Sequence, residues 1–480
     1  MATQLQNIPF LLEKKDVIII KPAKSTPSEV LSFSAIDNDP NLEILCQTIY
    51  AYKANPISTN GNAHHHHPHH PDPASLIKTA ISNALVHYYP LAGKLKRNVK
   101  GDRKLSMTCN GDGVPFLEAT ANCKLSSLNY LDGIDVQIAK QFVFDIASNS
   151  ECGGYFPLVF QVTKFSCGGF TIGMGLSHSV ADGFGAAQIF RAICEFASGK
   201  SEPTVKPIWE RERLTTSKTT KNQPSKMIPI DNPFFGLAKS PYMPTNEIVH
   251  ECFCIKSETI RNLKNNLMKE CGNGDSKERE TSTFTTVEVL GAYIWRSRVR
   301  AFKFNLEEKT LFSLTMGVRQ LLTNPPLPSG YYGNAFVPSN VVLVGKKLNE
   351  GPLSDVVKLI KESKKKCANE EYIREHIEIM EKLVELNIKV EGGNGATMVL
   401  TDWRQLGLLE KEDFGWKDPV NIIPVPWAMF GYVDLCIFMP PSNLDPSMKG
   451  GVRVLVSLPK DVMPKFKEEM DGLLHLGNDS

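Results

Sequence analysis

The chain has 480 residues, too many for one ordinary hydrophobic core, and this length predicts two domains of roughly 200 residues each. Hydrophobic residues make up 42% and charged residues 22%, a balance typical of a globular protein and not of a disordered or membrane-spanning chain. The formal charge of +2 comes from 54 basic and 52 acidic residues without a basic stripe, which argues against nucleic acid as a partner.

The amino-terminal region shows no pattern of a targeting or membrane segment. The first residues lack the charged and apolar regions of a secretory signal, and apolar runs such as Val17–Ile20 have the length of a strand. The eleven cysteines are odd in number and scattered, and Cys252 and Cys254 are too close for an ordinary disulfide. We therefore expect a cytoplasmic protein with reduced thiols and no membrane partner.

Six of the eleven histidines lie in one run, Asn62–Pro73. Its prolines prevent a fixed helix or strand, so a solvated loop is favoured over a metal site, although such a composition can bind metal. Apolar residues then recur at helical spacing from Leu76 to Leu85, with Asp72 or Ser75 available as the cap. The segment Tyr88–Leu95 predicts a turn that leads into a strand.

Two strands joined by a tight turn are predicted next, at Phe156–Phe165 and Gly168–Leu176. The second strand ends immediately before His178. A helix with its apolar residues between Ala186 and Phe196 follows, and Gly199 suits the position just after its end.

The segment 200–245 is rich in Lys, Pro, Ser and Thr and lacks periodicity, which predicts a long crossover between domains. The second half again mixes elements: helices are expected at Thr286–Ala301 and Asp461–Leu474, and an alternating strand at Val452–Leu458. Strands and helices recur in both halves, so we expect two α/β domains with a ligand site at their interface.

His178 is the best candidate for chemistry among the five histidines outside the run, because a strand delivers it to a sharp turn followed by Asp182 and Gly183. Acyl transfer to an alcohol or amine needs a base at such a strand end. The short HxxxDG pattern is weak by itself. A nucleophile elbow is excluded because the stretch around Ser177 lacks its closing glycine, and a phosphate loop because Cys194 occupies the first glycine position.

A second segment, Asp413–Trp416, lies more than two hundred residues further on and could alternatively be an aromatic turn packed into the core. The pairing of HxxxD with DFGW, in this order, resembles the plant BAHD acyltransferases over essentially the whole chain. Further matching segments are Tyr89–Gly93, Gln161–Phe165, Cys167–Phe170, Pro207–Glu212, Phe284–Arg296, Pro325–Asn334 and Thr401–Trp403.

Within that family the chain looks most like the spermidine coumaroyl and sinapoyl transferases. The suggestive stretches are Asp102–Cys109, Ala119–Asn122, Ser240–Thr245 and Pro419–Pro424. One departure is that DFGW is followed by Lys417 and Asp418, where the family usually continues with glycine. Because lysine seldom adopts a positive φ, the local loop geometry can differ, but activity is not put in doubt.

The resemblance implies an α/β fold of two chloramphenicol-acetyltransferase-like domains, joined by a long crossover loop, with the active-site channel at their interface. The expected division is 1–200 for the domain with HxxxD, 201–245 for the crossover loop and 246–480 for the domain with DFGW. His178 would be the general base that deprotonates the acceptor, without an acyl-enzyme.

The resemblance also implies roles for other residues. Asp182 is expected to be structural and to pair with Arg319, and Asp413 and Gly415 to support the fold. Trp403 is the candidate oxyanion donor, because an indole N–H can only donate, and it shares the acceptor pocket with Thr401. Hydroxyls of Thr285 and Thr286, at a helix start, are candidates for binding the CoA phosphates, although they would serve equally as ordinary caps.

These expectations define the ligands. Acyl-CoA is a co-substrate, no permanently bound cofactor or metal is expected, and the protein should be a monomer. An acceptor amine such as spermidine is favoured by the resemblance alone. An O-acyltransferase acting on an alcohol of specialised metabolism and a catalytically silent binding relative remain as alternatives.

Overall fold

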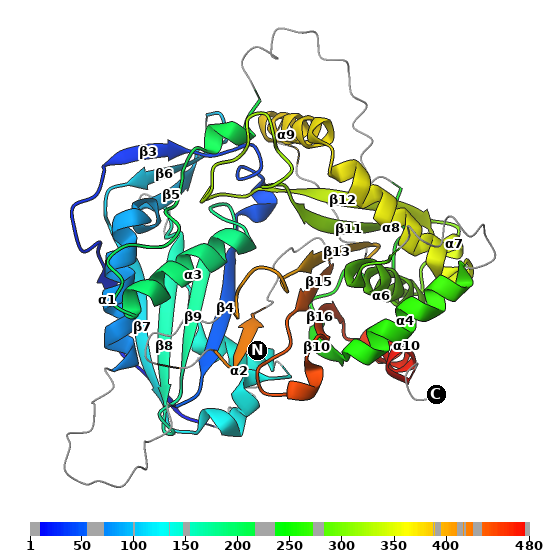
Figure 1. Ribbon diagram of the computed structural model, residues 1–480, viewed down its shortest axis with the longest axis horizontal. Coiled ribbons are helices and arrows are strands. Elements are labelled where there is room, and N and C mark those ends of the chain that lie inside the picture. The colour runs from blue at the N-terminus through cyan, green and yellow to red at the C-terminus, as the bar shows by residue number, and fades with distance from the viewer. Residues whose placement is uncertain are drawn as a thin grey trace.

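The computed structural model describes residues 10–54, 72–98, 101–133, 135–146, 154–216, 236–271, 283–386, 388, 395–409, 416, 419–425 and 434–475. The histidine-rich run up to residue 71 lies outside the described residues, and so do Asp413, Gly415, Lys417 and Asp418. The part of the chain that is described forms two lobes, each built around a β-sheet (Figure 1).

The first lobe contains a seven-stranded sheet in the order β1-β7-β8-β9-β4-β14, with β2 also paired to β7. Its strands are β1 (Leu12–Lys14), β2 (Ile18–Ile20), β4 (Leu45–Tyr52), β7 (Val114–Ala121), β8 (Leu158–Phe165), β9 (Phe170–Ser177) and β14 (Asn421–Pro424). Beside it lies a three-stranded sheet of β3 (Glu29–Ser32), β6 (Leu105–Cys109) and β5 (Lys94–Arg97).

Helices α1 (Pro73–His87) and α3 (Gly183–Ala197) cover one face of the first sheet (Figure 1). The Asp72 carboxylate accepts a hydrogen bond from Ser75 N at 3.0 Å, so it caps α1 as predicted. Gly199 has a φ of +93° just after α3, which confirms its predicted place beyond the helix end. The short α2 (Val136–Ala139) packs with the opposite face of the sheet.

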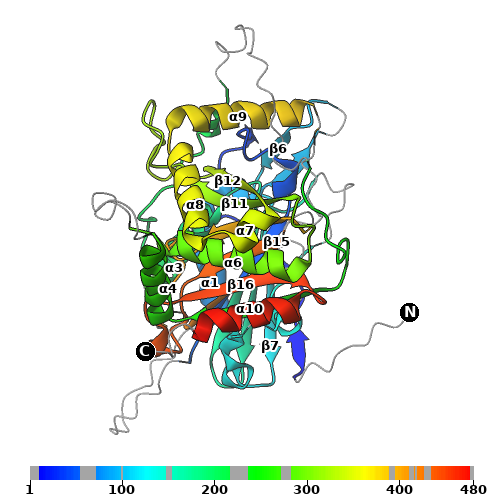
Figure 2. The ribbon, with the colours of Figure 1, turned by 90° about the vertical axis from the view of Figure 1, so that its right-hand side faces the viewer.

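The second lobe contains a six-stranded sheet in the order β10-β16-β15-β13-β11-β12. Its strands are β10 (Ile248–Ile255), β11 (Lys309–Gly317), β12 (Phe336–Val344), β13 (Thr397–Asp402), β15 (Asp434–Met439) and β16 (Val452–Pro459). Five helices pack outside this sheet (Figure 2): α4 (Ser257–Glu270), α6 (Thr286–Phe302), α7 (Gly345–Glu350), α8 (Leu353–Cys367) and α10 (Met463–His475).

A separate hydrophobic core joins the two lobes. Successive residues of a strand point to opposite faces, so Tyr50 of β4 faces α3 while Ile49 faces the second lobe. In the same way Phe438 of β15 packs under the helices of the second lobe, and Ile437 packs against the first lobe. The strand predicted at Val452–Leu458 is present as β16. Its residues are largely buried on both faces, whereas the alternating pattern predicted burial of one face.

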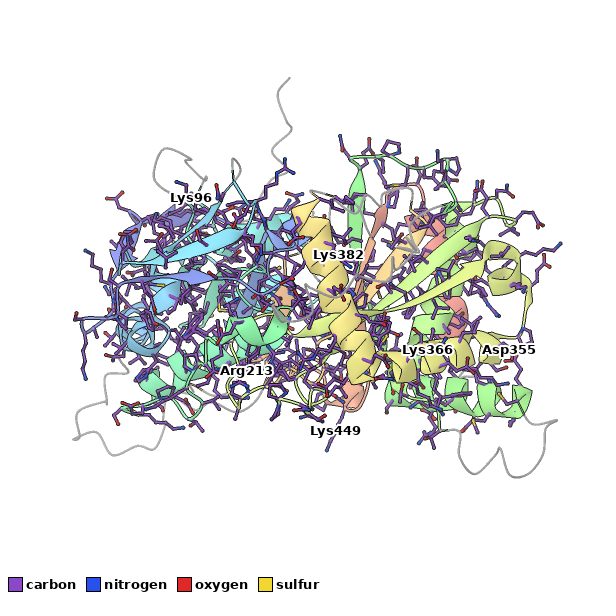
Figure 3. All side chains as sticks on the ribbon, turned by 90° about the horizontal axis from the view of Figure 1, so that it is seen from above. Lys96, Arg213, Asp355, Lys366, Lys382 and Lys449 are labelled. Carbon is purple, nitrogen blue, oxygen red and sulfur yellow. The ribbon has the colours of Figure 1, made fainter. Side chains whose placement is uncertain are left out.

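Helix α9 (Glu370–Glu385) bridges the lobes at the top of the molecule. Its Ile373 packs in one cluster with Ile36 of the first lobe, and Arg374 donates a hydrogen bond to the Arg213 carbonyl at 3.3 Å. From above, α9 with Lys382 lies across the seam between the lobes (Figure 3).

The mixed α/β fold with two sheet-containing domains is confirmed. The boundaries at 200 and 245 and the interface channel stay predictions. One strand crosses the expected division, because β14 lies in the range assigned to the second domain but pairs antiparallel with β4 of the first sheet. No helix among the described residues is long and apolar enough to span a membrane.

Candidate active site

His178 lies at the first position after β9, where a tight turn connects the sheet to α3. Its backbone N–H donates to the Ile44 carbonyl at 2.9 Å, and Val180 N closes the turn on the Ser177 carbonyl at 3.0 Å. Asp182 ends the turn as the N-cap of α3 and accepts hydrogen bonds from the amides of Phe184 and Gly185. The turn is therefore fixed at its start by backbone hydrogen bonds and at its end by the side-chain cap of Asp182.

Asp182 forms a two-point ion pair with Arg319, which follows β11 in the second lobe. The guanidinium nitrogens lie 2.7 and 2.8 Å from the two carboxylate oxygens, and Ala335 N donates to the same carboxylate at 3.1 Å. Burial alone would raise the pKa of Asp182, but the charge and hydrogen bonds of Arg319 and these amides hold it below its ordinary value. The predicted pairing is confirmed. The Asp182 carboxylate bonds to Arg319 and to backbone amides, which is a structural arrangement.

The ring of His178 contacts a different residue, Asn334, at 3.1 Å between Nδ1 and the amide Oδ1. The Asn334 amide nitrogen donates to the Asp37 carboxylate at 2.8 Å and to the His178 carbonyl at 2.7 Å. Because both amide hydrogens are used there, Oδ1 must accept from the ring. In the neutral ring Nδ1 then carries the hydrogen and Nε2 is the basic nitrogen.

Asp37 is fully buried, and its carboxylate accepts hydrogen bonds from Arg211 as well as from Asn334. The Arg211 guanidinium lies 2.7 Å from one Asp37 oxygen and also donates to the Val180 carbonyl at 2.7 Å. The other Asp37 oxygen accepts from the backbone and side-chain nitrogens of Asn334. A buried carboxylate needs such a partner set, because an unpaired charge in the interior is very costly.

The segment after β13 packs beside the His178 turn. Leu406 approaches Gly183 so closely that a β-carbon there would lie 2.5 Å from a Leu406 methyl group. Trp403 begins this segment and is held by its backbone N–H, which donates to the Phe438 carbonyl at 2.7 Å. Thr401 lies on β13 opposite Ile437 of β15. The roles expected for Trp403 and Thr401 in the pocket stay predictions.

The two threonines at the start of α6 are engaged within the protein. Thr285 forms a capping box with Glu288, and Thr286 accepts a hydrogen bond from Lys264 at 3.1 Å. The pKa of Lys264 is lowered, first by burial and then by the nearby charge of Arg404. Lys364 donates to the Thr285 hydroxyl at 3.5 Å, so two lysines lie at this helix start. The positive charge fits a phosphate group, although the threonine hydroxyls also serve as ordinary caps.

Asp413 and Gly415 of the DFGW segment lie outside the described residues, so their expected structural roles stay predictions. Trp416 is described and is buried at 5% exposure. Its ring packs edge-on against Phe170 of β9, with 5.2 Å between the ring centroids. This residue of the segment thus packs into the core of the first lobe, near the strand that carries His178.

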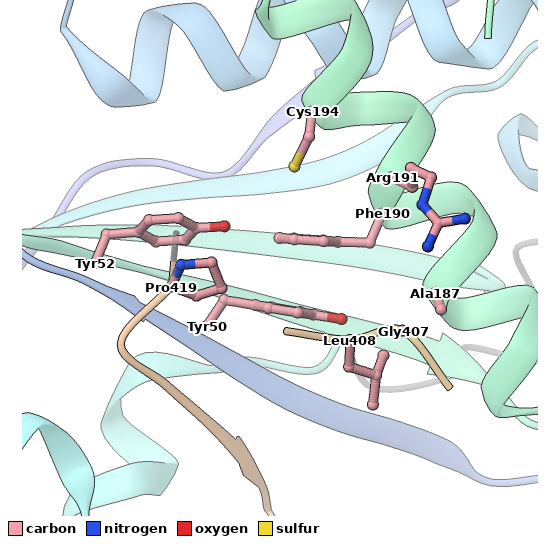
Figure 4. A pocket seen from close by; sticks show the side chains of 9 residues that line it. All are labelled: Tyr50, Tyr52, Ala187, Phe190, Arg191, Cys194, Gly407, Leu408 and Pro419. Carbon is pink, nitrogen blue, oxygen red and sulfur yellow. The ribbon is translucent and has the colours of Figure 1, made fainter. Parts of the chain in front are cut away.

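A small cavity between β4 and α3 is also lined by Gly407 and Leu408 (Figure 4). Its volume of about 10 Å³ suits roughly one water molecule and is far too small for an acyl group or a polyamine. The Tyr50 hydroxyl, buried at its edge, has no hydrogen-bond partner within the described part of the chain. We therefore regard the cavity as a hydration site of the core.

Sequence reasoning missed Asp37 entirely and noted Asn334 and Arg211 only as members of matching segments. Asp37 lies 297 positions from its partner Asn334, and Asn334 lies 156 positions from His178. Arg211 lies 174 positions from Asp37. A charged residue directly after the mostly apolar stretch Phe33–Ile36, which includes Ser34, was the only local signal.

Comparison with known proteins gives a consistent result. A family model described as Transferase family matches residues 10–473. A spermidine coumaroyl-CoA acyltransferase of Arabidopsis thaliana is 43% identical, covering 98% of this chain and 97% of the relative. A spermidine sinapoyl-CoA acyltransferase of the same organism is 41% identical, covering 97% and 98%. The crystal structure of vinorine synthase has the same fold, with a TM-score of 0.70 at 23% identity over 96% of this chain and 98% of that one.

Proposed function

The chain belongs to the BAHD family of acyl-CoA-dependent acyltransferases, and from this premise we propose that it transfers a hydroxycinnamoyl-type acyl group from CoA to an amine such as spermidine. The two relatives at 43% and 41% identity, both named for spermidine, support this choice of acceptor and acyl group. The single observation on which the mechanism depends is the contact between His178 Nδ1 and Asn334, because it leaves Nε2 as the basic nitrogen.

In the proposed reaction the acceptor nitrogen attacks the thioester carbonyl as the neutral amine, after its ammonium proton has passed to solvent, and His178 Nε2 accepts a further proton from it during the attack. The carbon–nitrogen bond forms, and the tetrahedral intermediate then breaks the carbon–sulfur bond. The departing CoA thiolate takes the proton from His178, so the base is regenerated and no acyl-enzyme forms. Asn334 stabilises the imidazolium through Nδ1–H, in the role that an orienting acceptor has in other histidine sites.

The developing oxyanion needs a donor that is already in position. Trp403 is the candidate, with Thr401 in the same pocket, because the segment that begins at Trp403 packs against Gly183 in the His178 turn. Asp182, Asp413 and Gly415 are assigned to the scaffold. The CoA phosphates are assigned to the start of α6, where Thr285 and Thr286 lie beside lysine side chains. A cytoplasmic location and a monomeric state stay predictions.

The proposal is tested by incubating the purified protein with coumaroyl-, sinapoyl-, benzoyl- and acetyl-CoA, each against spermidine, agmatine, shikimate and benzyl alcohol. Release of CoA thiol is followed, and products are identified by mass. We expect the fastest release with a hydroxycinnamoyl-CoA and spermidine. Release with alcohols alone would replace the amine proposal by an O-acyltransferase, and no release with any pair would favour the silent binding relative.

The general base is tested with His178→Ala. We expect kcat to fall by about 10²–10⁴-fold, the usual contribution of a positioned base, while the midpoint of urea unfolding stays unchanged. His475→Ala is the matched control, because that histidine is exposed at the end of α10 and its removal should leave kcat unchanged. Near-normal turnover by His178→Ala would contradict the assignment.

A further inference from the structure

Both ends of the segment from Asp37 to Ile44 are linked to the His178 turn by hydrogen bonds. Asp37 holds the His178 ring through Asn334 at one end, and the Ile44 carbonyl accepts the His178 backbone N–H at the other end. Two further carboxylates, Asp39 and Glu43, lie between these two contacts in the sequence. Three carboxylates, those of Asp37, Asp39 and Glu43, therefore lie in a segment whose two ends are linked to the turn that carries the proposed base.

Glu43 is already neutralised within the protein. Arg97 Nε lies 2.6 Å from one of its oxygens, and the Tyr155 hydroxyl donates to the other at 3.0 Å. The remaining Arg97 nitrogens donate to the carbonyls of Arg103 and Asn38. Each Arg97 nitrogen thus has an acceptor within the protein, and Glu43 already has a cationic partner.

Asp39 differs from Glu43 because no lysine or arginine of the described residues lies within ion-pair distance of it. One carboxylate oxygen accepts from the backbone and side-chain nitrogens of Asn41, both at 2.9 Å, and the other accepts from none of the described groups. The carboxylate is only partly exposed. A cation beside this partly desolvated carboxylate would interact with it more strongly than with a fully solvated one.

Asp39 lies two residues from Asp37, which holds Asn334 against the His178 ring, and its backbone N–H donates to the Ile36 carbonyl at 3.1 Å. Burial raises the pKa of Asp39, while hydrogen bonds from Asn41 and the charges of His178 and Arg97 act in the opposite direction. A carboxylate in this position can attract a cationic group that arrives beside the base. It is partly buried, so salt screens it less than a surface charge.

We propose that Asp39 binds a second, non-reacting ammonium group of the acceptor and thereby makes the enzyme select polyamines over monoamines. The inference rests on the proposed amine acceptor. An alkyl amine has a pKa near 10.4, so a polyamine arrives with several positive charges. The reacting nitrogen releases its ammonium proton to solvent before its lone pair attacks, and it passes a second proton to His178 during the attack, whereas the distal nitrogen keeps its charge. Asp39 pairs with that distal charge and holds the reacting nitrogen in place.

The test is Asp39→Asn, which removes the charge but keeps the oxygen that caps the following 3-10 turn at Pro40–Leu42. Asp445→Asn is a matched control, because Asp445 caps the similar turn Pro446–Met448 in the second lobe. Steady-state kinetics are measured with spermidine and with an uncharged-tail monoamine of equal length, at fixed coumaroyl-CoA. Urea unfolding of each variant monitors the fold.

In the wild type we expect kcat/KM for spermidine to exceed that for the monoamine by about 10- to 100-fold, the range for one charge-assisted contact. Asp39→Asn should remove most of this preference by raising the KM for spermidine, with kcat for the monoamine unchanged. Asp445→Asn should keep the full preference. Raising the salt concentration should reduce the preference in the wild type more than in Asp39→Asn.

The inference is overturned if Asp39→Asn lowers kcat/KM equally for both amines, or lowers neither, while spermidine is still acylated by the wild type. In those cases the proposed function stands and only the role of Asp39 is wrong. If the wild type acylates alcohols and no amine, the proposed function fails first, and the role of Asp39 as an ammonium site fails with it.

Discussion

Two aspartate–arginine pairs flank the His178 turn, and they hold different parts of it. The pair of Asp182 and Arg319 has side-chain exposures of 10% and 20% and fixes the backbone where α3 begins. The pair of Asp37 and Arg211 has exposures of 0% and 2% and fixes Asn334, which contacts the His178 ring. The first pair therefore positions the turn, and the second sets which ring nitrogen is basic.

This difference shows why proximity in sequence is a poor guide to catalytic coupling. Asp182 lies four residues from His178, yet its oxygens are directed to Arg319 and to backbone amides. Asp37 lies far away in sequence and influences the ring through one intervening amide. If HxxxD were interpreted by itself as a catalytic dyad, Asp182 would be assigned to the His178 ring in place of Asn334.

The largest expected effect is on stability, from breaking the more buried pair. Arg211→Met should lower the free energy of unfolding by about 3–5 kcal/mol, because it leaves the Asp37 charge buried and uncompensated. Arg319→Met should cost less, about 1–3 kcal/mol, because water reaches that pair. Both are measured by urea unfolding at pH 7.

A matched control for these arginine variants is Arg261→Met, in an exposed pair with Glu258 where both side chains are 68% exposed. Arg261→Met should lower the free energy of unfolding by less than about 1 kcal/mol. If Arg211→Met proved no more destabilising than Arg261→Met, the inner pair would not be the anchor that its burial indicates.

A smaller effect is expected from Asn334→Leu, which keeps the side-chain size but removes the acceptor for His178 Nδ1–H. The kcat should fall by about 10- to 100-fold, because the ring can then adopt the other tautomer, and the KM for acyl-CoA should stay unchanged. The measurement is steady-state kinetics on folded variant, together with its pH–rate profile. A profile and kcat like those of the wild type would assign Asn334 to structure alone.

The smallest expected effect is the pH dependence of the outer pair. The pKa of Asp182 is held below its ordinary value of 3.8, so its stabilising contribution is present above that pH and is lost as the pH falls towards the folded-state pKa. The difference in unfolding free energy between wild type and Asp182→Asn should therefore be largest at pH 5–7 and shrink below about pH 4. Asp355→Asn, at an exposed position (Figure 3), controls for general acid effects.

Much of the local structure of the site could be predicted from the sequence. The two strands before His178, the helix after it and the glycine beyond that helix are confirmed within a few residues. Arg319 could be assigned as the partner of Asp182 only through the family resemblance. Asn334 could not be assigned to the His178 ring, because no periodicity or spacing links two loops of different lobes.

The sequence by itself determined the family, the candidate base and the alternation of strands and helices, because these depend on short motifs and on hydrogen bonds within a few residues. Only the tertiary structure decided that β14 returns to the first sheet, that Asp37 holds Asn334 and that Asp39 bonds to Asn41 without an ion pair to a lysine or arginine of the described residues. The physical reason is that a buried charge takes its donors from whichever segments the folded core brings beside it, at any distance along the chain.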